Sequence, residues 1–519
     1  MDLRRENANL FRENPIERAQ KEVRKLKHTF ANVYEVVQKE ALSHFHRTNL
    51  IQEEFFKYKQ NMDIKDTRPR KLRIACLIVV ISMAIFVAWR VAHIILVTDP
   101  LLGIYGMLVA YIIVQQFIVS YFFYRDPYKK AIKNELAMKY NPRVSVVIAT
   151  KNERHVIFDA ARSALASTYK NLEVVIIDDG SNDDGFTAAN IDDLAKHNPR
   201  VKAKHLGEYE TLRHGEKVWV PKNEGKRKAM RAGFHLSEGE LIIFLDSDTI
   251  VETEAIERLV RVMNNNPNMG CCVGYCRALN ASQNWLTKMQ DGWYSSAFTI
   301  GKGMEAPLGT VSCCSGILSV YRREALEPCI DQWATDIFLG KEFQPGDDRQ
   351  LTAMVVGGSK YNINRNLKQW KSGYCESALS ISETPYRFKK FLKQQVRWEQ
   401  SWVRCLCYTF PFWFHGRNPL VCADYYLRMG LSFLAPVIAI LNLVVAPIMG
   451  HWDSMFIYLG GLGCLSLLFC MDFALYNPRQ KKMAIYRMGF TFLSVGTLYF
   501  LLYYSVYTVL RRQNDWLTR

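Results

Sequence analysis

The chain has 519 residues, 49% of them apolar, which is enough for one large domain with further elements or for two domains. Its formal net charge of +17 would suit nucleic acid, a membrane surface or a phosphorylated substrate, but the basic residues flank long apolar runs, so we expect a membrane and a phosphorylated substrate and no nucleic acid. None of the 13 cysteines forms a C-x-x-C pair or a zinc-spaced cluster with histidine, which excludes a zinc finger and predicts reduced, cytosolic thiols.

The N-terminal region, residues 1–71, is charged throughout and predicts a cytosolic helical segment without a secretory signal peptide. Asn14-Pro15 is a helix-start signal. Apolar residues follow at alternating steps of three and four, as in a heptad seam: Ile16, Ala19, Val23, Leu26, Phe30, Val33 and Val37. This stripe must pack on a second copy of the chain, on the rest of the chain or on the membrane. A homo-oligomer is therefore one of three open interpretations.

Two apolar runs in residues 72–125, Ile74–Val97 and Leu101–Phe123, are long enough to cross a bilayer, which takes roughly 20 residues. The link between them carries no Lys or Arg, whereas basic residues precede the first run and follow the second. By the positive-inside rule, both outer flanks are expected to be cytoplasmic.

From residue 140 to residue 382 the sequence reads as an α/β domain. Apolar, strand-like runs at Val144–Ala149, Val174–Ile177 and Leu241–Leu245 alternate with helical stretches, which predicts a doubly wound sheet. Each run ends in polar or acidic residues, and ligands bind beyond the carboxyl ends of the strands in such sheets. We therefore expect one active-site crevice at this edge.

The third strand ends in two acids, Asp246 and Asp248, separated by one residue. Alternation along an extended chain puts both carboxylates on the same side, where they repel each other unless a positive charge lies between them. A divalent cation such as Mg²⁺ or Mn²⁺, held by these acids and by substrate phosphates, meets that need. An isolated D-x-D can also be a plain polar turn.

Two further stretches carry chemistry. Asn223–Ala229 opens an amphipathic helix with a glycine and three cations, of which Lys226 and Arg227 suit a diphosphate. Gly346-Asp347-Asp348-Arg349 is a second paired-acid motif, in which one acid would act as a general base while its neighbour or Arg349 orients it.

Residues 383–420 mix cations and aromatic residues at helical spacing, which predicts amphipathic helices along the membrane interface. Residues 421–476 contain two more apolar runs, at about 425–449 and 455–475, joined by a connector without Lys or Arg. These runs predict two membrane-spanning helices with an external connector.

The last apolar stretch lies within residues 484–519 and poses a problem of parity. If Met488–Leu510 crossed the membrane, Arg511, Arg512 and Arg519 would lie outside, against the charge rule that orders the other segments. We therefore predict that this stretch lies in the interface or re-enters, which keeps the C-terminal Trp-Leu-Thr-Arg cytoplasmic.

Four motifs in this order, Asp178-Asp179-Gly180, Asp246-Ser247-Asp248, Gly346-Asp347-Asp348-Arg349 and Gln394-Gln395-Val396-Arg397-Trp398, resemble those of the membrane-integrated processive glycosyltransferases of family 2, the group of cellulose, chitin and hyaluronan synthases. The GDDR, KQQxRW and closing WxTR segments look most like hyaluronan synthases of the single-polypeptide class. The chain departs from their pattern in carrying Leu517 for Gly, Ile317 for Pro and Gly301–Ala306 for the usual Glu-Arg-x-x-Gln-Ser. The resemblance implies a cytosolic domain of the GT-A type with a mixed sheet.

The resemblance also implies roles for single residues. Donor binding would fall to Asp178, Asp179, Lys226, Arg227, Asp246, Arg397, Trp516 and Arg519. Acceptor binding would fall to Cys313, Asp347, Arg349 and Trp398, with Trp398 as a platform for a sugar ring. Asp348 would be the catalytic base, and Asp248 with Asp246 would hold Mg²⁺ or Mn²⁺. Trp402 and Trp413 are expected to be anchors of the interface helices.

The function implied is that of a processive, inverting glycosyltransferase in the plasma membrane. It would polymerise sugars from UDP-activated donors, UDP-GlcNAc and UDP-GlcA in the hyaluronan-like case, and pass the growing polysaccharide between membrane helices in contact with lipid. One alternative is a chitin-like homopolymer synthase that uses UDP-GlcNAc alone. A second alternative among enzymes is a lipid-linked sugar transferase. The alternative from a different class of protein is a non-catalytic membrane subunit that binds nucleotide sugars.

Overall fold

The computed structural model describes residues 47–60, 78, 82, 85, 89, 100–153, 156–211, 217–358, 368–410 and 419–512. The chain divides into two compact units, residues 1–60 and 61–519. In the first unit residues 47–60 are helical, and Lys57 pairs with Glu53 and Glu54 at 2.8 and 3.0 Å. The predicted heptad seam lies outside the described residues, as does most of the first apolar run.

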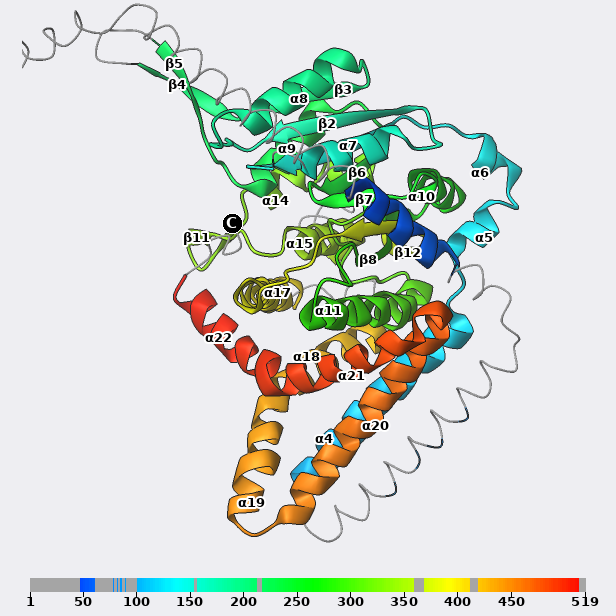
Figure 1. The fold of residues 1–519 in the computed structure, drawn as a ribbon, viewed down its shortest axis with the longest axis vertical. Helices are drawn as coiled ribbons and strands as arrows, with labels where there is room; N and C mark the ends of the chain where they lie inside the picture. The colour runs from blue at the N-terminus through cyan, green and yellow to red at the C-terminus, as the bar shows by residue number, and fades with distance from the viewer. Residues whose placement is uncertain are drawn as a thin grey trace, which may run out of the picture. The chain divides into compact units, whose positions relative to one another are not determined.

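The second unit is built on an eight-stranded mixed sheet, in the order β3-β2-β1-β6-β9-β8-β12-β7 (Figure 1). Its strands are β1 (Val144–Thr150), β2 (Leu172–Asp178), β3 (Val201–His205), β6 (Leu241–Asp246), β7 (Thr249–Val251), β8 (Met269–Ala278), β9 (Ser319–Arg322) and β12 (Lys371–Ser382). Four neighbouring strands, β3, β2, β1 and β6, are parallel, β8 pairs in parallel with β12, and β9 and β7 pair antiparallel to their neighbours.

The three predicted strands lie side by side because their apolar runs are buried on both faces, as central parallel strands require. Their register aligns the ends: Thr150 of β1 lies opposite Asp178 of β2, and Ala149 lies opposite Asp246 of β6. The polar residues that follow the strands therefore meet at one edge of the sheet.

Helices cover both faces of the sheet. Alternate residues of β1 such as Val146 pack in a core with α7 (Val156–Leu165), α8 (Phe186–His197) and α10 (Ala255–Asn265). On the other face α9 (Lys226–Leu236) approaches so closely that a Cβ on Gly233 would lie 2.3 Å from the side chain of Val147. The α/β fold with a doubly wound mixed sheet, expected for a GT-A type domain, is confirmed.

The remaining elements of the α/β region are short. Two hairpins are formed by β4 (Gly207–Thr211) with β5 (Lys217–Pro221) and by β10 (Ile337–Phe338) with β11 (Lys341–Glu342). The other helical segments are α5 (Pro127–Ala131), α6 (Glu135–Lys139), α11 (Trp285–Ser296), η2 (Ala297–Lys302), α12 (Gly303–Glu305), η3 (Ala306–Leu308), α13 (Arg323–Leu326), α14 (Ile330–Ala334), α15 (Asp347–Ala353) and η4 (Met354–Gly358).

Four stretches of the described chain are long and apolar enough to cross a membrane: Leu101–Ala131, Val421–Ile448, Trp452–Tyr476 and Pro478–Leu510. They comprise α4 (Pro100–Ile118) and η1 (Val119–Phe123); α18 (Pro419–Ile440), η5 (Leu441–Val445) and α19 (Ala446–Ile448); α20 (Trp452–Tyr476); and η6 (Pro478–Met483), α21 (Ala484–Leu493), η7 (Ser494–Leu498) and α22 (Tyr499–Leu510). These apolar helices fit a membrane protein.

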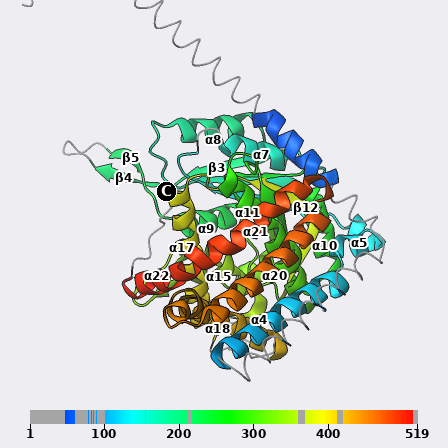
Figure 2. The same ribbon diagram turned by 60° about the horizontal axis from the view of Figure 1, so that its bottom comes forward.

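Helices α4 and α20 lie side by side in both views (Figures 1 and 2). The rings of Phe117 and Phe469 meet at 5.6 Å, and the hydroxyl of Tyr121 donates to Asp472 at 2.7 Å. This hydrogen bond gives the buried carboxylate of Asp472 a partner within an otherwise apolar pair of helices.

The last apolar stretch runs across the direction of α4 and α20 (Figure 1). It packs on α11, which belongs to the domain that the sequence assigned to the cytosol, and on α17 (Phe388–Thr409), which the sequence placed along the membrane interface. A Cβ on Gly292 of α11 would lie 3.1 Å from Cβ of Arg487 in α21, and Gln400 of α17 donates to Thr508 of α22 at 2.9 Å. The interfacial placement of residues 484–519 stays a prediction.

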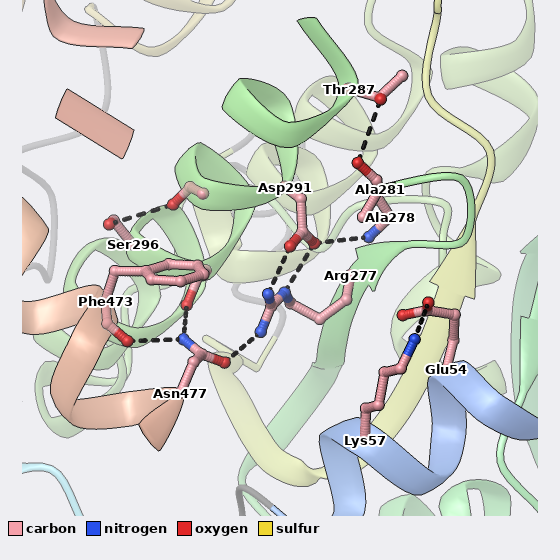
Figure 3. A network of polar contacts seen from close by, with 12 residues as sticks. Glu54, Lys57, Arg277, Ala278, Ala281, Thr287, Asp291, Ser296, Phe473 and Asn477 are labelled. Atoms are coloured by element: carbon pink, nitrogen blue, oxygen red, sulfur yellow. Dashed lines mark hydrogen bonds and ion pairs between the residues drawn. The ribbon is translucent and has the colours of Figure 1, made fainter. Parts of the chain in front are cut away.

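A buried polar network ties the end of α20 to the α/β region (Figure 3). Arg277 of β8, 1% exposed, binds Asp291 of α11 through Nε and Nη2 at 2.8 and 2.5 Å. Its Nη1 donates to Asn477, which follows α20, at 2.5 Å. The amide of Asn477 in turn donates to Ser295 of α11 at 3.1 Å. The network therefore joins β8 of the sheet and α11 of the α/β region to the end of the apolar helix α20.

Candidate active site

The first acid of the Asp178-Asp179-Gly180 motif has its hydrogen bonds inside the protein. Asp178 ends β2 and accepts from the backbone and hydroxyl of Ser181 at 3.0 and 2.5 Å, and it lies 3.0 Å from Nδ1 of His205. Burial would raise the pKa of Asp178, but the hydrogen bonds from His205 and Ser181 outweigh it, so this pKa is lowered. The same contact with Asp178 raises the pKa of His205 to about 9.

The second acid holds the loop that precedes α9. Asp179 accepts from the backbone N–H groups of Glu224 and Gly225 at 2.8 and 3.1 Å, and burial raises its pKa to about 6 because these bonds offset burial only in part. Gly180 has φ +65°, and a Cβ there would lie 2.4 Å from the carbonyl carbon of Lys222. The motif thus joins two loops at the sheet edge. Its predicted role in donor binding stays a prediction.

Lys226, the first residue of α9, joins two motifs that are far apart in sequence. Its Nζ lies 2.6 Å from Oδ1 of Asp246 and 2.8 Å from Oδ2 of Asp347. Burial would lower the pKa of Lys226, but the charges of the two acids outweigh it and raise that pKa. Lys226 in turn lowers the pKa of Asp347 against the effect of burial. The lysine is therefore charged and connects the D-x-D motif with the GDDR motif.

The neighbouring cation, Arg227, has interior partners. It is 5% exposed and donates to the carbonyl groups of Trp333 and Pro345, both at 3.2 Å. Its Nη1 also lies 3.7 Å from Asp336. These contacts fix the chain in front of α15, so Arg227 supports the site from within. Its predicted place near the nucleotide rests on the sequence alone.

The pair Asp246 and Asp248 fits a divalent cation that also binds phosphate. Asp246 ends β6, and Oδ1 of Asp248 accepts from Ser382 at 3.2 Å. After burial, the charges of both acids are among the causes that raise the pKa of Tyr294 in α11. Among the described residues no group of three or more His, Cys, Asp or Glu is placed to hold a metal. Two carboxylates suit Mg²⁺ or Mn²⁺ only when substrate oxygens complete the ligand set.

The GDDR motif is pressed against α17, the helix that carries the Q-x-x-R-W motif. Gly346 has φ +72° and precedes α15, and a Cβ at this position would lie 1.8 Å from Oγ of Ser401 in α17. Only glycine combines this left-handed backbone with so close an approach. The two motifs thereby have a fixed position relative to each other.

Asp348 lies beside the segment that the sequence assigned to the acceptor. Its Oδ1 accepts from the backbone of Arg349 at 2.8 Å, and its carbonyl accepts from Thr352 at 2.8 Å. The hydroxyl of Thr352 also accepts from the backbone of Cys314 at 2.8 Å. Burial raises the pKa of Cys313, and the charge of Asp348 adds to this effect. The predicted base and the predicted acceptor residue are therefore neighbours.

Arg397 and Trp398 come from the middle of α17. After burial and Lys226, the charge of Arg397 is among the causes that lower the pKa of Asp347. The ring of Trp398 stacks on Trp293 of α11 at 5.6 Å, and Trp293 stacks on Phe490 of α21 at 5.5 Å. Arg397 thus favours the charged form of Asp347, whereas Trp398 belongs to an aromatic stack that reaches the last apolar stretch.

Several residues at the site gave no signal in the sequence. Burial raises the pKa of Tyr294 in α11, and the charges of Asp246 and Asp248 add to this effect. Gly316 approaches Asp246 so closely that a Cβ there would lie 2.9 Å from Oδ1. Trp402, expected as an interface anchor, instead packs against Arg349. Proximity to a predicted motif was the only available signal. Trp413, Trp516 and Arg519 lie outside the described residues.

The sheet, the acids at its edge and the apolar helices suit a membrane-associated transferase. The model of "Glycosyl transferase family 2" matches residues 145–329, and that of "Glycosyl transferase family group 2" matches residues 241–510, just over half of the chain. The chain belongs to glycosyl transferase family group 2 and is a glycosyltransferase.

Curated relatives agree with this assignment. An N-acetylglucosaminyltransferase of Rhizobium meliloti (strain 1021) is 27% identical over 384 residues, which cover 73% of this chain and 82% of that protein. A hyaluronan synthase of Streptococcus pyogenes is 29% identical over 304 residues, 58% of this chain and 65% of that protein. The predicted relation to membrane-integrated family 2 glycosyltransferases, hyaluronan synthases among them, is confirmed.

Among solved structures, a mannosyltransferase from Pyrobaculum calidifontis in complex with GDP-Man and Mn²⁺ is 16% identical. The match has a TM-score of 0.43 and covers 76% of this chain and 99% of that one.

Proposed function

We propose that this enzyme is a processive, inverting glycosyltransferase that builds a polysaccharide from UDP-activated sugars and passes it across the plasma membrane. In the hyaluronan-like form of the proposal the donors are UDP-GlcNAc and UDP-GlcA. The catalytic domain faces the cytosol, where nucleotide sugars are found.

The observation that carries the proposal is the contact of Lys226 with both Asp246 and Asp347, at 2.6 and 2.8 Å. One cation thereby joins the D-x-D acid, assigned here to the donor diphosphate, with an acid of the GDDR motif, assigned here to the acceptor side. Arg397 adds a second positive charge from the Q-x-x-R-W helix. Both cations suit phosphate oxygens, which carry the charge of the leaving group.

Asp246 and Asp248 would hold Mg²⁺ or Mn²⁺ on the donor diphosphate. The metal, when bound, neutralises the charge that builds up on UDP as it leaves. Lys226 and Arg397 do the same from the protein side, and Asp347 keeps the ammonium of Lys226 in place.

Asp348 is the proposed general base. It is only partly buried, and its Oδ1 is oriented by the backbone N–H of Arg349. Its carboxylate takes the proton of the acceptor hydroxyl as that oxygen bonds to the anomeric carbon of the donor. The bond from this carbon to the diphosphate breaks on the opposite face, its electron pair leaves with UDP, and the configuration inverts.

Trp398 is the proposed platform for the acceptor sugar, with Cys313 beside the base. Aromatic faces suit sugar rings because their apolar surface can be buried while the hydroxyl groups stay hydrogen-bonded. The aromatic stack from Trp398 to Phe490 supports a route for the polymer from the site toward the apolar helices. Lipid would contact the outer faces of those helices.

A homopolymer made from UDP-GlcNAc alone is the second candidate. The similarity to an N-acetylglucosaminyltransferase over 73% of this chain favours it. Both candidates share UDP-GlcNAc as a donor and differ in whether UDP-GlcA is needed.

The test follows UDP release by purified protein with Mn²⁺ and with UDP-GlcNAc, UDP-GlcA and UDP-Glc, singly and in pairs. Sustained turnover that needs both UDP-GlcNAc and UDP-GlcA supports the hyaluronan-like form. Turnover with UDP-GlcNAc alone supports the homopolymer. Release of UDP without a polymer of increasing length contradicts processive synthesis.

A further inference from the structure

Trp402 of α17 lies between a residue of the GDDR motif and an apolar helix. The guanidinium carbon of Arg349 lies 3.7 Å from the centre of the indole ring. The ring of Tyr425 in α18 stacks with the same indole at 5.8 Å and an interplanar angle of 26°. Tyr425 is 3% exposed, and it belongs to the apolar stretch Val421–Ile448.

The indole accounts for the orientation of Arg349. Nε of Arg349 is buried and has no hydrogen-bond partner among the residues that the structure describes. An arginine that lacks such a bond keeps its plane through stacking, and a tryptophan face is the strongest partner for a guanidinium. Loss of the ring would leave the side chain free to change rotamer.

The position of Arg349 matters because it follows the proposed base directly. Its backbone N–H donates to Oδ1 of Asp348. Burial raises the pKa of Cys313, and the positive charge of Arg349 opposes this effect. A sugar held at Cys313 would therefore meet the charge of this guanidinium, whose N–H groups can donate to an oxygen atom. A hydroxyl, an amide carbonyl or a carboxylate could accept them.

We propose that Trp402 is a positioning residue for the acceptor sugar: its indole, backed by Tyr425 of α18, holds the guanidinium of Arg349 where it donates to an acceptor oxygen. This inference rests on the proposed function. The orientation of an acceptor ligand then depends on the place of an apolar helix, which links the polymerisation site to the helices that the polymer would pass.

The test compares Trp402→Leu, Trp402→Phe and Arg349→Met by kcat and by affinity for UDP. We expect kcat of Trp402→Leu to fall about 10- to 100-fold, the effect of a misplaced group, while the affinity for UDP stays within about twofold. Trp402→Phe keeps an aromatic face and should recover most of kcat. Trp285→Leu, at an exposed tryptophan at the start of α11, is the matched control and should keep the wild-type kcat.

The double variant Arg349→Met/Trp402→Leu separates coupling from mere proximity. We expect it to be no slower, and its apparent Tm no lower, than the worse single variant, because one contact is lost in each case. Additive losses, or equal damage by Phe and Leu at position 402, overturn the inference. The Tm comparison needs no turnover, so it tests the coupling of Arg349 and Trp402 even if the enzyme uses none of the donors. Failure to use any donor would contradict the proposed function and not this coupling.

Discussion

Two adjacent acids in the GDDR motif have different environments. Asp347 is 6% exposed and paired with Lys226, which lowers its pKa against the effect of burial, so it is poorly suited to accept a proton. Asp348 is partly exposed and adjoins Cys313. The difference places the charged lysine with the first acid and supports the proposal that the second acid takes the proton.

Replacement of the proposed base separates chemistry from binding. Asp348→Asn should lower polymer synthesis by about 10²- to 10⁴-fold, the usual contribution of a general base, and should leave the affinity for UDP unchanged. Synthesis is measured by incorporation of labelled sugar, and binding by calorimetry with UDP and Mn²⁺.

Asp347→Asn is the matched comparison. It removes a partner of Lys226, so both synthesis and UDP affinity should fall. If Asp348→Asn loses UDP affinity as well, its role is structural and the assignment of the base is wrong.

Glu399 of α17 gives a prediction about pH. Burial raises its pKa to about 7 from the ordinary 4.5, while the charge of Arg349 opposes this shift. An acid with a higher pKa in the fold than in the unfolded chain reduces stability as pH rises from about 4.5 to about 7, since the folded form must then carry a buried charge. Glu399→Gln should therefore raise the apparent Tm at pH 8 and change it little at pH 5.

The exposed Glu135 supplies the control, because Glu135→Gln should leave the apparent Tm unchanged at both pH values. Thermal unfolding in detergent measures all three proteins. An equal shift of Glu399→Gln at both pH values would contradict the role of ionisation.

Which acids meet was predictable, but how they pair was not. The apolar strands and their parallel order were enough to place Asp178 and Asp246 at one edge. The bond of Lys226 to Asp347 depends on side-chain geometry across two separate loops, which no local pattern encodes. Arg227 is next to Lys226 on the same helix, but it donates to buried backbone carbonyl groups and not to the acids. This difference also depends on side-chain geometry that the local sequence does not encode.

At the scale of elements, the position of α15 against α17 depends on one glycine. Gly346→Ala should reduce both stability and activity severely, because a Cβ would lie 1.8 Å from Oγ of Ser401 and φ is +72°. Gly340→Ala is the control: its φ is +79°, but nothing lies within 4 Å of the added Cβ. It should lower the free energy of unfolding by only about 1 to 2 kcal/mol, the cost of placing alanine in a left-handed backbone conformation. Equal apparent Tm values for the two variants would contradict the packing argument.

The network of Arg277, Asp291 and Asn477 gives a second prediction at this scale (Figure 3). Arg277→Met leaves Asp291 buried without its charged partner, which costs about 3 to 5 kcal/mol, and it also removes one of the hydrogen bonds that hold the end of α20. Lys139→Met breaks an exposed pair with Glu135 and should cost less than about 1 kcal/mol. The measurement is the free energy of unfolding in detergent, and equal losses for the two variants would contradict the anchoring role.

The sequence predicted the type of most long elements, because strands buried on both faces and membrane-spanning helices both appear as continuous apolar runs and differ clearly in length. It also predicted a helix after Glu383, seen as α17 from Phe388 to Thr409. It did not indicate that α21 and α22 pack on α11 and α17, since contacts such as Gln400 with Thr508 lie far apart in the chain. Such tertiary contacts leave no periodic pattern.

At the scale of the whole molecule, synthesis and export are proposed to share one polypeptide. The match of the second family model to residues 241–510 covers both the acidic motifs and the apolar helices from α18 to α22. The anchoring of α20 through Arg277 and the stack of Trp402 on Tyr425 connect the same two regions. The central claim is that the acids form one donor site and that this site feeds a passage through the membrane.

Purified enzyme in sealed liposomes, sorted for outward-facing catalytic domains, tests this claim most directly. UDP-GlcNAc, UDP-GlcA and Mn²⁺ are added outside, followed by a polysaccharide hydrolase that does not enter the vesicles. We predict that wild-type enzyme accumulates polymer protected in the lumen and that Asp348→Asn accumulates at least about 100-fold less. Polymer that is made but fully degraded from outside would contradict the coupling of synthesis to export.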